Sequence, residues 1–323
     1  MLRSIPWLLK NQPSINVLVR QEFCSEALRT AKAFSVGSIQ EKWETRFKSE
    51  NIPEAGTSII NILAHVLQLP KLDDVRKSHD LILSDSQLSK IDELCQCRLA
   101  RMPIQYIIRE WEFRDITLKM IPPVFIPRPE TEELVELILQ QIDTKQQMTF
   151  LEIGCGSGAI VLSILKHVPL SSAIALDQNR LACELTLANA QSQGLRDRLR
   201  IFKHKLVDKL PKEIEDDKFD MIISNPPYVP SGQLLQLEPE IKIYEDLRAL
   251  DGGADGLAII RAILELAGEH LNPEGTLWLE VDSSHPEKIA AYLDEHESRI
   301  GLKYICSYKD LFRNERFVEI MKV

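Results

Sequence analysis

The sequence lacks any long hydrophobic run. Nowhere among its 323 residues do 18 consecutive apolar residues occur, so we expect no membrane span. With 44% hydrophobic and 27% charged residues, the composition is that of an ordinary globular chain. Its length allows one large domain and one small one.

Paired cysteines are lacking as well. The six cysteines do not have the spacing of a zinc ribbon or a disulfide-rich scaffold, which excludes both classes and favours a reducing compartment. Cys95 and Cys97 are one residue apart in a predicted helix, so they point away from each other, and no second Cys or His pair completes a site. The sequence therefore predicts no metal centre.

The charge is uneven along the chain. Residues 1–36 have five basic and two acidic side chains, a net of +3, which leaves −12 for residues 37–323 out of a total of −9. A basic leader before an acidic body is typical of a mitochondrial transit peptide, so we predict one over residues 1–36 and a location in the mitochondrial matrix. Glu22 and Glu26 are unusual in such leaders and favour the alternative, an ordinary cytosolic N-terminus.

Residues 37–101 have apolar side chains at helical spacing. The spacing is interrupted at Pro53, at residues 69–71 and at residues 84–86, which predicts three or four helices. We expect a small helical domain that docks a substrate.

Residues 102–128 are expected to form a hairpin linker. Apolar and aromatic residues at 106–108, 111–113 and 116–118 predict three short extended pieces joined by polar turns. The four prolines within residues 122–129 remove backbone donors and exclude a helix there.

Residues 129–323 alternate between strands and helices after an initial helix from Glu130 to Ile142. This alternation predicts an α/β fold in which a seven-stranded, mostly parallel sheet is covered on both faces. The last two strands are close in sequence, so we expect them to form an antiparallel hairpin at the sheet edge. The predicted strands are 149–153, 173–177, 199–203, 219–224, 276–281, 302–308 and 316–321.

A glycine-rich turn follows the first of these strands. Gly154, Gly156 and Gly158 let the backbone turn sharply and approach a ligand at the carboxyl end of the strand, where open α/β sheets bind ligands. Dinucleotide oxidoreductases space such glycines differently, as G-x-G-x-x-G. Asp177 ends the second strand, where its carboxylate can accept from both hydroxyls of a ribose. The sequence therefore predicts a cofactor that contains a nucleoside.

The fourth strand runs into Asn225, Pro226, Pro227 and Tyr228. Because the prolines fix the backbone, the Asn225 side-chain oxygen and the Pro226 carbonyl can accept from an NH2 group, and Tyr228 offers a flat face. An amide or aromatic amine nitrogen is a poor nucleophile, since its lone pair is delocalised. Two acceptors would orient it toward the methyl group of a sulfonium. We therefore predict an S-adenosylmethionine-dependent N-methyltransferase that needs no strong general base.

These motifs together resemble the HemK/PrmC family of release factor glutamine methyltransferases, which are class I methyltransferases preceded by a small helical domain. The resemblance covers about residues 40–323 and includes segments 126–132, 152–158, 225–228 and 238–257. Arg109 stands where the family commonly has a glycine. Residues 203–206 stand where it usually has an acidic residue near the adenine.

The resemblance implies methylation of the glutamine in the Gly-Gly-Gln motif of a peptide chain release factor. By this likeness Asn225, Pro226, Pro227 and Tyr228 hold that glutamine, and Asn225, Pro226 and Tyr228 are the catalytic residues. We expect a monomer, and the transit-like leader resembles that of a mitochondrial member. The residues implied in S-adenosylmethionine binding are Gly154, Cys155, Gly156, Ser157, Gly158, Asp177, Leu206 and Asn225.

Three other functions are compatible with parts of this sequence. Methylation of DNA adenine would suit the 225–228 motif equally well, but a body with a net charge of −12 is poorly suited to nucleic acid. A non-catalytic scaffold would predict damage in the glycine turn or in the 225–228 motif, and neither is damaged. An oxidoreductase would leave the 225–228 motif unexplained.

Overall fold

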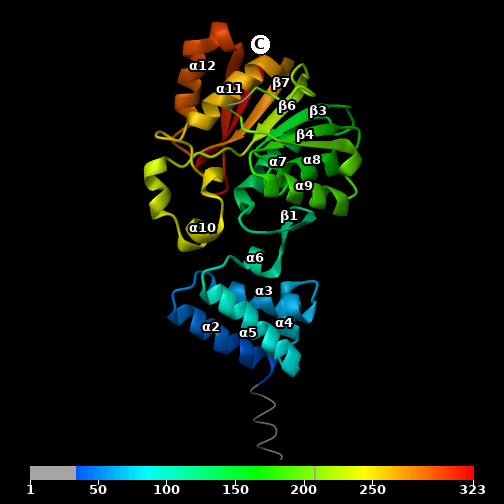
Figure 1. The fold of residues 1–323 in the computed structure, drawn as a ribbon, viewed down its shortest axis with the longest axis vertical. Helices are drawn as coiled ribbons and strands as arrows, with labels where there is room; N and C mark the ends of the chain where they lie inside the picture. The colour runs from blue at the N-terminus through cyan, green and yellow to red at the C-terminus, as the bar shows by residue number, and fades with distance from the viewer. Residues whose placement is uncertain (1–33, 207–208) are drawn as a thin grey trace, which may run out of the picture. The chain divides into compact units, whose positions relative to one another are not determined.

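The computed structural model describes residues 34–206 and 209–323. The chain divides after Ile108 into two compact units, one of which is helical while the other is built on a seven-stranded sheet (Figure 1). Most of the predicted leader, residues 1–33, lies outside the described residues. Within the described part, no helix has both the length and the hydrophobicity needed to cross a membrane.

The helical unit confirms the prediction of three or four helices within residues 37–101. Ser84 begins the last of these with a capping box that includes Gln87, which satisfies orphan donors at the helix start. Trp43, Phe47 and Ile59 are buried in the core of the unit. The helices of this unit are α2 (Val36–Ser49), α3 (Ala55–Leu67), α4 (Leu72–Lys77), α5 (Asp85–Leu99) and α6 (Ile104–Ile108).

The first described residues are part of this unit. The Ser35 side chain accepts from the backbone N–H of Ser38 at 3.3 Å and so caps α2. Ser35 also forms an isolated antiparallel bridge with Ile82, and the Val36 side chain is fully buried. Residues 34–36 therefore contribute to the packing of the helical unit, although the sequence assigned them to the leader.

The expectation of an extended piece at residues 106–108 is wrong, because these residues form the helix α6. Tyr106, Ile107 and Ile108 are all buried, and α6 packs against α3 and α5. Isoleucine and tyrosine favour strands on average, but burial against two neighbouring helices outweighs that preference. The other two extended pieces of the linker are confirmed as an antiparallel pair, β1 (Glu110–Phe113) and β2 (Ile116–Lys119).

The seven strands of the second unit have the order β5-β4-β3-β6-β7-β9-β8. The first five in this order are parallel to one another, and β9 is antiparallel to both β7 and β8. The predicted mostly parallel sheet with an antiparallel edge hairpin is confirmed. The strands are β3 (Thr149–Ile153), β4 (Ser172–Asp177), β5 (Leu199–Lys203), β6 (Phe219–Ser224), β7 (Leu271–Glu280), β8 (Leu302–Lys309) and β9 (Glu315–Lys322).

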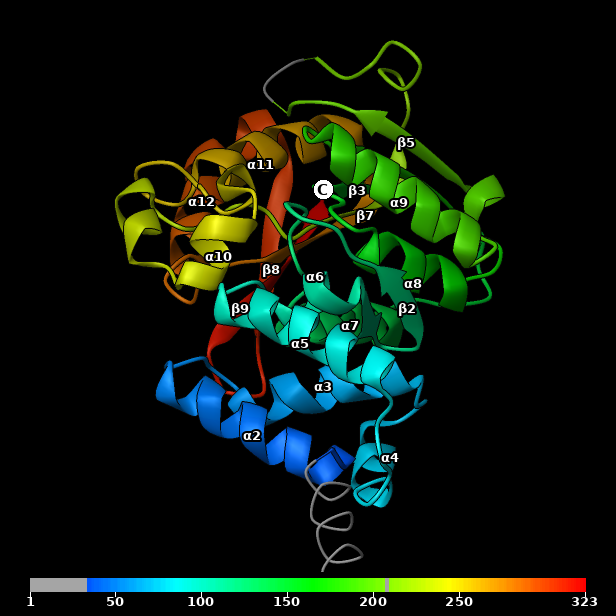
Figure 2. The same ribbon diagram turned by 60° about the horizontal axis from the view of Figure 1, so that its bottom comes forward.

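Helices cover both faces of this sheet. Figures 1 and 2 show α7, α8 and α9 on one face and α11 and α12 on the other. The central strands are nearly continuous apolar runs because both of their faces are buried. The helices are α7 (Pro129–Gln141), α8 (Ala159–His167), α9 (Arg180–Ser192), α11 (Ala258–His270) and α12 (Pro286–Ile300), with the short helix α10 (Pro239–Tyr244) and the 3-10 helices η1 (Arg196–Arg198), η2 (Ser231–Gln236) and η3 (Leu247–Ala249).

Several element starts differ from the sequence prediction: α7, β4 and β9 each begin one residue earlier than expected, and β7 begins five residues earlier. Pro129 is the first residue of α7. A backbone N–H at this position would have no partner within the helix, so a proline is tolerated there. Strand β7 begins at Leu271 and not at Thr276, because Leu271 pairs with Phe219 and a register shift separates this pairing from that of Thr276 with Met221. Pro273 and Gly275 lie between these two pairings and interrupt the strand pattern, so the sequence does not indicate the first residues of β7.

Candidate active site

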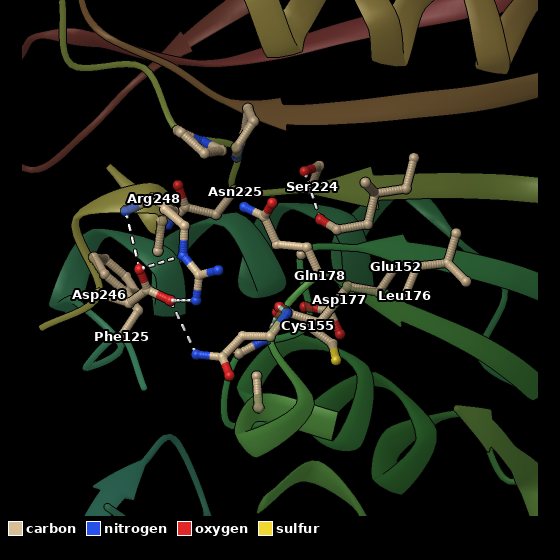
Figure 3. A pocket seen from close by; sticks show the side chains of 18 of the residues that line it. Phe125, Glu152, Cys155, Leu176, Asp177, Gln178, Ser224, Asn225, Asp246 and Arg248 are labelled. Carbon is tan, nitrogen blue, oxygen red and sulfur yellow. Dashed lines mark hydrogen bonds and ion pairs between the residues drawn. The ribbon is translucent and has the colours of Figure 1, made fainter. Parts of the chain in front are cut away.

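A cavity lies at the carboxyl ends of β3, β4, β5 and β6, and the proline-rich segment 122–129 and residues 246–250 complete its wall (Figure 3). Strand β3 pairs with β4 on one side and with β6 on the other, so the chain order reverses here and adjacent loops separate. Gly158 is not among the lining residues. The predicted site residues that line the cavity are Gly154, Cys155, Gly156, Ser157, Asp177, Leu206, Asn225, Pro226, Pro227 and Tyr228.

Helix α9 holds the glycine turn from behind. The Thr186 hydroxyl donates to the carbonyl oxygen of Gly156 at 3.0 Å, and the Asn189 amide donates to that of Ser157 at 2.9 Å. Gly158 has a φ of 85°, and a Cβ atom there would lie 2.9 Å from a methyl carbon of Thr186. Gly158 therefore permits the close packing of α8 and α9 that supports the turn.

Glu152 fixes the start of α8. Its side chain is almost completely buried, and its Oε2 accepts from the backbone N–H of Val161 at 3.0 Å. Burial raises the pKa of this carboxyl well above its usual value, and the bond from Val161 opposes that change. An acceptor at this place satisfies one of the unpaired donors of the helix N-terminus.

Asp177 is held by two backbone donors. Its Oδ2 accepts from Gly156 N–H at 2.9 Å, and its Oδ1 accepts from Asn179 N–H at 2.7 Å. Burial raises the pKa of Asp177, and these two hydrogen bonds counteract the effect. Each oxygen keeps a lone pair, so the carboxylate can still accept from the hydroxyls of a ligand.

Asn225 follows β6 and is anchored through its amide nitrogen. Its Nδ2 donates to the Thr131 hydroxyl at 3.2 Å, and that hydroxyl donates to Glu280 Oε2 at 2.8 Å. Thr131 lies in the first turn of α7, and Glu280 ends β7. This arrangement leaves the Asn225 side-chain oxygen available as an acceptor.

A glycine-rich loop packs on the backbone that follows Asn225. Val229 and Asp251 form a parallel bridge, and a Cβ atom on Gly256, whose φ is 77°, would lie 2.4 Å from the Tyr228 carbonyl oxygen. Burial raises the pKa of Tyr228 to about 12, so the phenol stays protonated at neutral pH. Tyr228 can therefore present a flat face but not a base.

The proline-rich segment is tied to the opposite wall by an ion pair whose carboxylate is buried. Arg128 donates to Glu245 Oε1 at 2.7 Å, while Ile126 N–H donates to the other carboxylate oxygen at 3.2 Å. The Arg128 guanidinium also lies 4.7 Å from the centroid of the Phe125 ring, and Phe125 lines the cavity. These contacts fix Phe125 in the cavity wall.

A second ion pair flanks the cavity (Figure 3). Arg248 donates to Asp246 Oδ2 at 2.7 Å, and the Asn179 amide donates to the same oxygen at 3.0 Å. The hydrogen bond from Arg248 is the main cause of the lowered pKa of Asp246. This pair connects the segment that contains η3 with the end of β4.

After β5, the chain contributes His204, Lys205 and Leu206 to the cavity wall. The backbone N–H of His204 donates to the Asp177 carbonyl at 2.8 Å and so extends the pairing of β5 with β4. This brings the predicted residue Leu206 into the wall.

The sequence reasoning missed Phe125, Thr131, Arg248 and Glu280. Phe125 lies in the proline-rich segment and Thr131 in segment 126–132, so both were within reach of a sequence argument. Glu280, like Asp177, lies at the end of a predicted strand, and this position could have indicated a site residue. Arg248 lies in a segment without periodicity, and no local pattern indicates its position.

Comparisons with known proteins point to one family. The chain matches the PrmC N-terminal domain family over residues 38–108 and the methyltransferase small domain family over residues 117–238. It is 41% identical over 289 residues to the human MTRF1L release factor glutamine methyltransferase, a match that covers 87% of this chain and 85% of the relative. It is 38% identical over 233 residues to the release factor glutamine methyltransferase of Thermosynechococcus vestitus, covering 72% of this chain and 78% of that one.

Proposed function

The chain belongs to the family of release factor glutamine methyltransferases, and from this premise we propose that it methylates the glutamine of the Gly-Gly-Gln motif in a peptide chain release factor. The methyl donor is S-adenosylmethionine, and the acceptor is the side-chain amide nitrogen. The observation that carries the proposal is the anchoring of Asn225. With its Nδ2 bonded to Thr131, its Oδ1 can receive an N–H from a substrate.

The substrate amide is activated by orientation and not by a base. Asn225 Oδ1 and the Pro226 carbonyl accept the two N–H bonds of the glutamine and aim the nitrogen at the cofactor. Bound S-adenosylmethionine supplies an electrophilic methyl carbon on a sulfonium. The bond between the methyl carbon and sulfur would break as the bond to the amide nitrogen forms, and S-adenosylhomocysteine would leave. The surplus proton on the methylated nitrogen would be acidic enough to pass to water. Tyr228 covers the planar amide with its ring.

The cavity has room for a nucleoside cofactor beside the glycine turn. A Cβ atom on Gly156 would meet no atom within 4 Å, so the turn leaves open space beside its backbone. We assign the ribose hydroxyls to Asp177 and the adenine to the side of Leu206. Residues 154–157 and Asn225 complete the binding site, with Cys155 and Ser157 contributing backbone atoms.

A DNA adenine methyltransferase is the second candidate, because an exocyclic aromatic amine fits two acceptors and a flat ring equally well. Residues 37–323 have a net charge of −12, which repels phosphate. A protein substrate is therefore favoured, and the helical unit is the part we assign to docking the release factor. We propose that the enzyme acts as a monomer.

The leader supports a mitochondrial destination, and within it the matrix. Residues 1–36 have a net charge of +3, whereas the remainder is acidic. Imaging of the tagged full chain in cells, alongside a chain without residues 1–33, measures this directly. Equal distribution of the two forms would contradict the proposal.

The proposed activity is tested by mass spectrometry of a purified release factor after incubation with the enzyme and methyl-labelled S-adenosylmethionine. We expect one methyl group on the glutamine of the Gly-Gly-Gln motif. A release factor in which that glutamine is replaced by glutamate should stay unlabelled. Duplex DNA is incubated in parallel, and label in DNA without label in the release factor would refute the assignment in favour of the second candidate.

A further inference from the structure

Three side chains from separate elements form a buried chain of hydrogen bonds behind the acceptor site. Asn225 Nδ2 donates to Thr131 Oγ1 at 3.2 Å, and Thr131 Oγ1 donates to Glu280 Oε2 at 2.8 Å. The side chains of Thr131 and Glu280 are 3% and 1% exposed, so water does not compete for these bonds.

The direction of each hydrogen bond between Asn225, Thr131 and Glu280 follows from which of their atoms carry a hydrogen. An ionised carboxylate can only accept, so the single hydroxyl proton of Thr131 goes to Glu280. The Thr131 oxygen can then only accept, and its partner must be the NH2 end of Asn225. The opposite end of the amide, Oδ1, is consequently turned away from this chain. A flipped amide would place two acceptors against each other and leave a buried group unsatisfied.

We propose that Thr131 and Glu280 are positioning residues that fix the orientation of the Asn225 amide and thereby keep its oxygen available to the substrate NH2 group. This inference rests on the proposed function. Thr131 in the first turn of α7 and Glu280 at the end of β7 act in catalysis through Asn225, without contact with the reacting atoms.

The ionisation of Glu280 determines whether this orientation is maintained. Burial raises the pKa of Glu280 to about 7, while the Thr131 bond and the positive charge of Arg316 oppose the rise and the negative charge of Glu130 adds to it. Tyr228, a further titratable group close to it, stays protonated in this range. Below about pH 7, a protonated carboxyl can donate to Thr131. The hydroxyl proton is then free to bond with the oxygen of a flipped Asn225 amide.

The test compares Thr131→Val, which removes the hydroxyl and keeps the branched shape, with Thr131→Ser, which keeps the hydroxyl. We expect Thr131→Val to lower kcat by about ten- to a hundredfold, the loss typical of a misplaced catalytic group. The KM for the release factor and the Kd for S-adenosylmethionine should remain within about twofold in both variants. Thr131→Ser should retain most of the kcat. Equal kcat values for wild type and Thr131→Val, or equal losses in the two variants, would overturn the proposal.

A second readout does not depend on turnover. The side-chain amide of Asn225 is followed by NMR of asparagine-labelled protein and assigned by its disappearance in Asn225→Ala. We expect its shift to titrate near pH 7 in the wild type, the pKa of Glu280, and to be constant in Glu280→Gln. An Asn225 chemical shift that does not change with pH in the wild type, or that titrates equally in Glu280→Gln, would overturn the role of Glu280. Absence of methylation by the wild type would instead refute the proposed function. Because the NMR titration does not require methylation, the two failures can be told apart.

Discussion

The hydroxyl group of Ser224 donates a hydrogen bond to the carbonyl oxygen of Ile153 over 2.6 Å, and both residues are buried. Ser224 ends β6 and Ile153 ends β3, which are adjacent parallel strands. The bond therefore connects the glycine turn with the 225–228 motif at the point where each leaves the sheet. The distance between the cofactor site and the acceptor site depends on this connection.

Replacement of Ser224 by alanine should reduce both stability and activity. The change leaves the Ile153 carbonyl without its side-chain donor in a buried place, which costs about 1–3 kcal/mol of unfolding free energy. Denaturant unfolding and kcat measurements check this. Ser163→Ala is the matched control, because Ser163 is fully buried in α8 and its hydroxyl has no hydrogen-bond partner among the described residues. Equal losses in the two variants would argue against the connection.

Replacement of Asn225 by alanine should abolish methyl transfer while most cofactor binding persists. Loss of one of two acceptors that act in the transition state costs about a hundred- to a thousandfold in kcat. Single-turnover methylation and calorimetric titration with S-adenosylmethionine separate the two effects. Asn272→Ala removes a partly exposed asparagine that bonds to Asp220 and serves as the control. Full activity of Asn225→Ala would exclude the proposed role.

Replacement of Asp177 by alanine should act on the cofactor and not on the acceptor. Its carboxylate is held by the N–H groups of Gly156 and Asn179, so the substitution removes a preorganised acceptor for ribose hydroxyls. We expect S-adenosylmethionine to bind at least about tenfold more weakly, since hydrogen bonds to a charged group contribute about 1.5–3 kcal/mol. An unchanged Kd would remove Asp177 from the site.

Glu280 should make the enzyme less stable as the pH rises. Burial raises the folded-state pKa of Glu280 from 4.5 to about 7, so the protonated form stabilises the fold below pH 4.5 and this contribution is lost as the pH passes 7. The full difference corresponds to about 3 kcal/mol. Glu280→Gln should therefore gain stability over wild type as the pH rises from 4.5 to about 8, as measured by denaturant unfolding. Glu295→Gln, an exposed position on α12, should show no such trend.

Replacement of Arg109 by glycine should stabilise the protein. Arg109 has a φ of 61°, in the left-handed region that costs a residue with a Cβ atom about 1–2 kcal/mol. Arg109→Ala keeps the Cβ atom and should give no gain, which separates backbone strain from loss of the side chain. Thermal melting of both variants is the measurement, and a lower melting temperature for Arg109→Gly would contradict the explanation.

Short windows of the sequence determined the sheet and the two motifs that end its central strands. Apolar runs of strand length, the alternate glycines at 154–158 and the prolines at 226 and 227 restrict the backbone locally, so β3, β5 and β6 were predictable at their observed residues. The proposed acceptor role of Asn225 and the position of Asp177 in the cavity follow from the same local restrictions. The resemblance to a known family added Leu206.

Only the tertiary structure decided what supports these motifs. Thr131 and Glu280 are 149 residues apart, and Asn225 and Thr131 are 94 apart, yet they form one hydrogen-bonded chain. Likewise, α6 is helical because it packs against α3 and α5, which outweighs the strand preference of its own residues. Periodicity and backbone restriction act over a few residues and can be read from a sequence. Contacts between distant segments exist only after the sheet has brought them together, because burial and hydrogen bonding depend on the neighbours that folding provides.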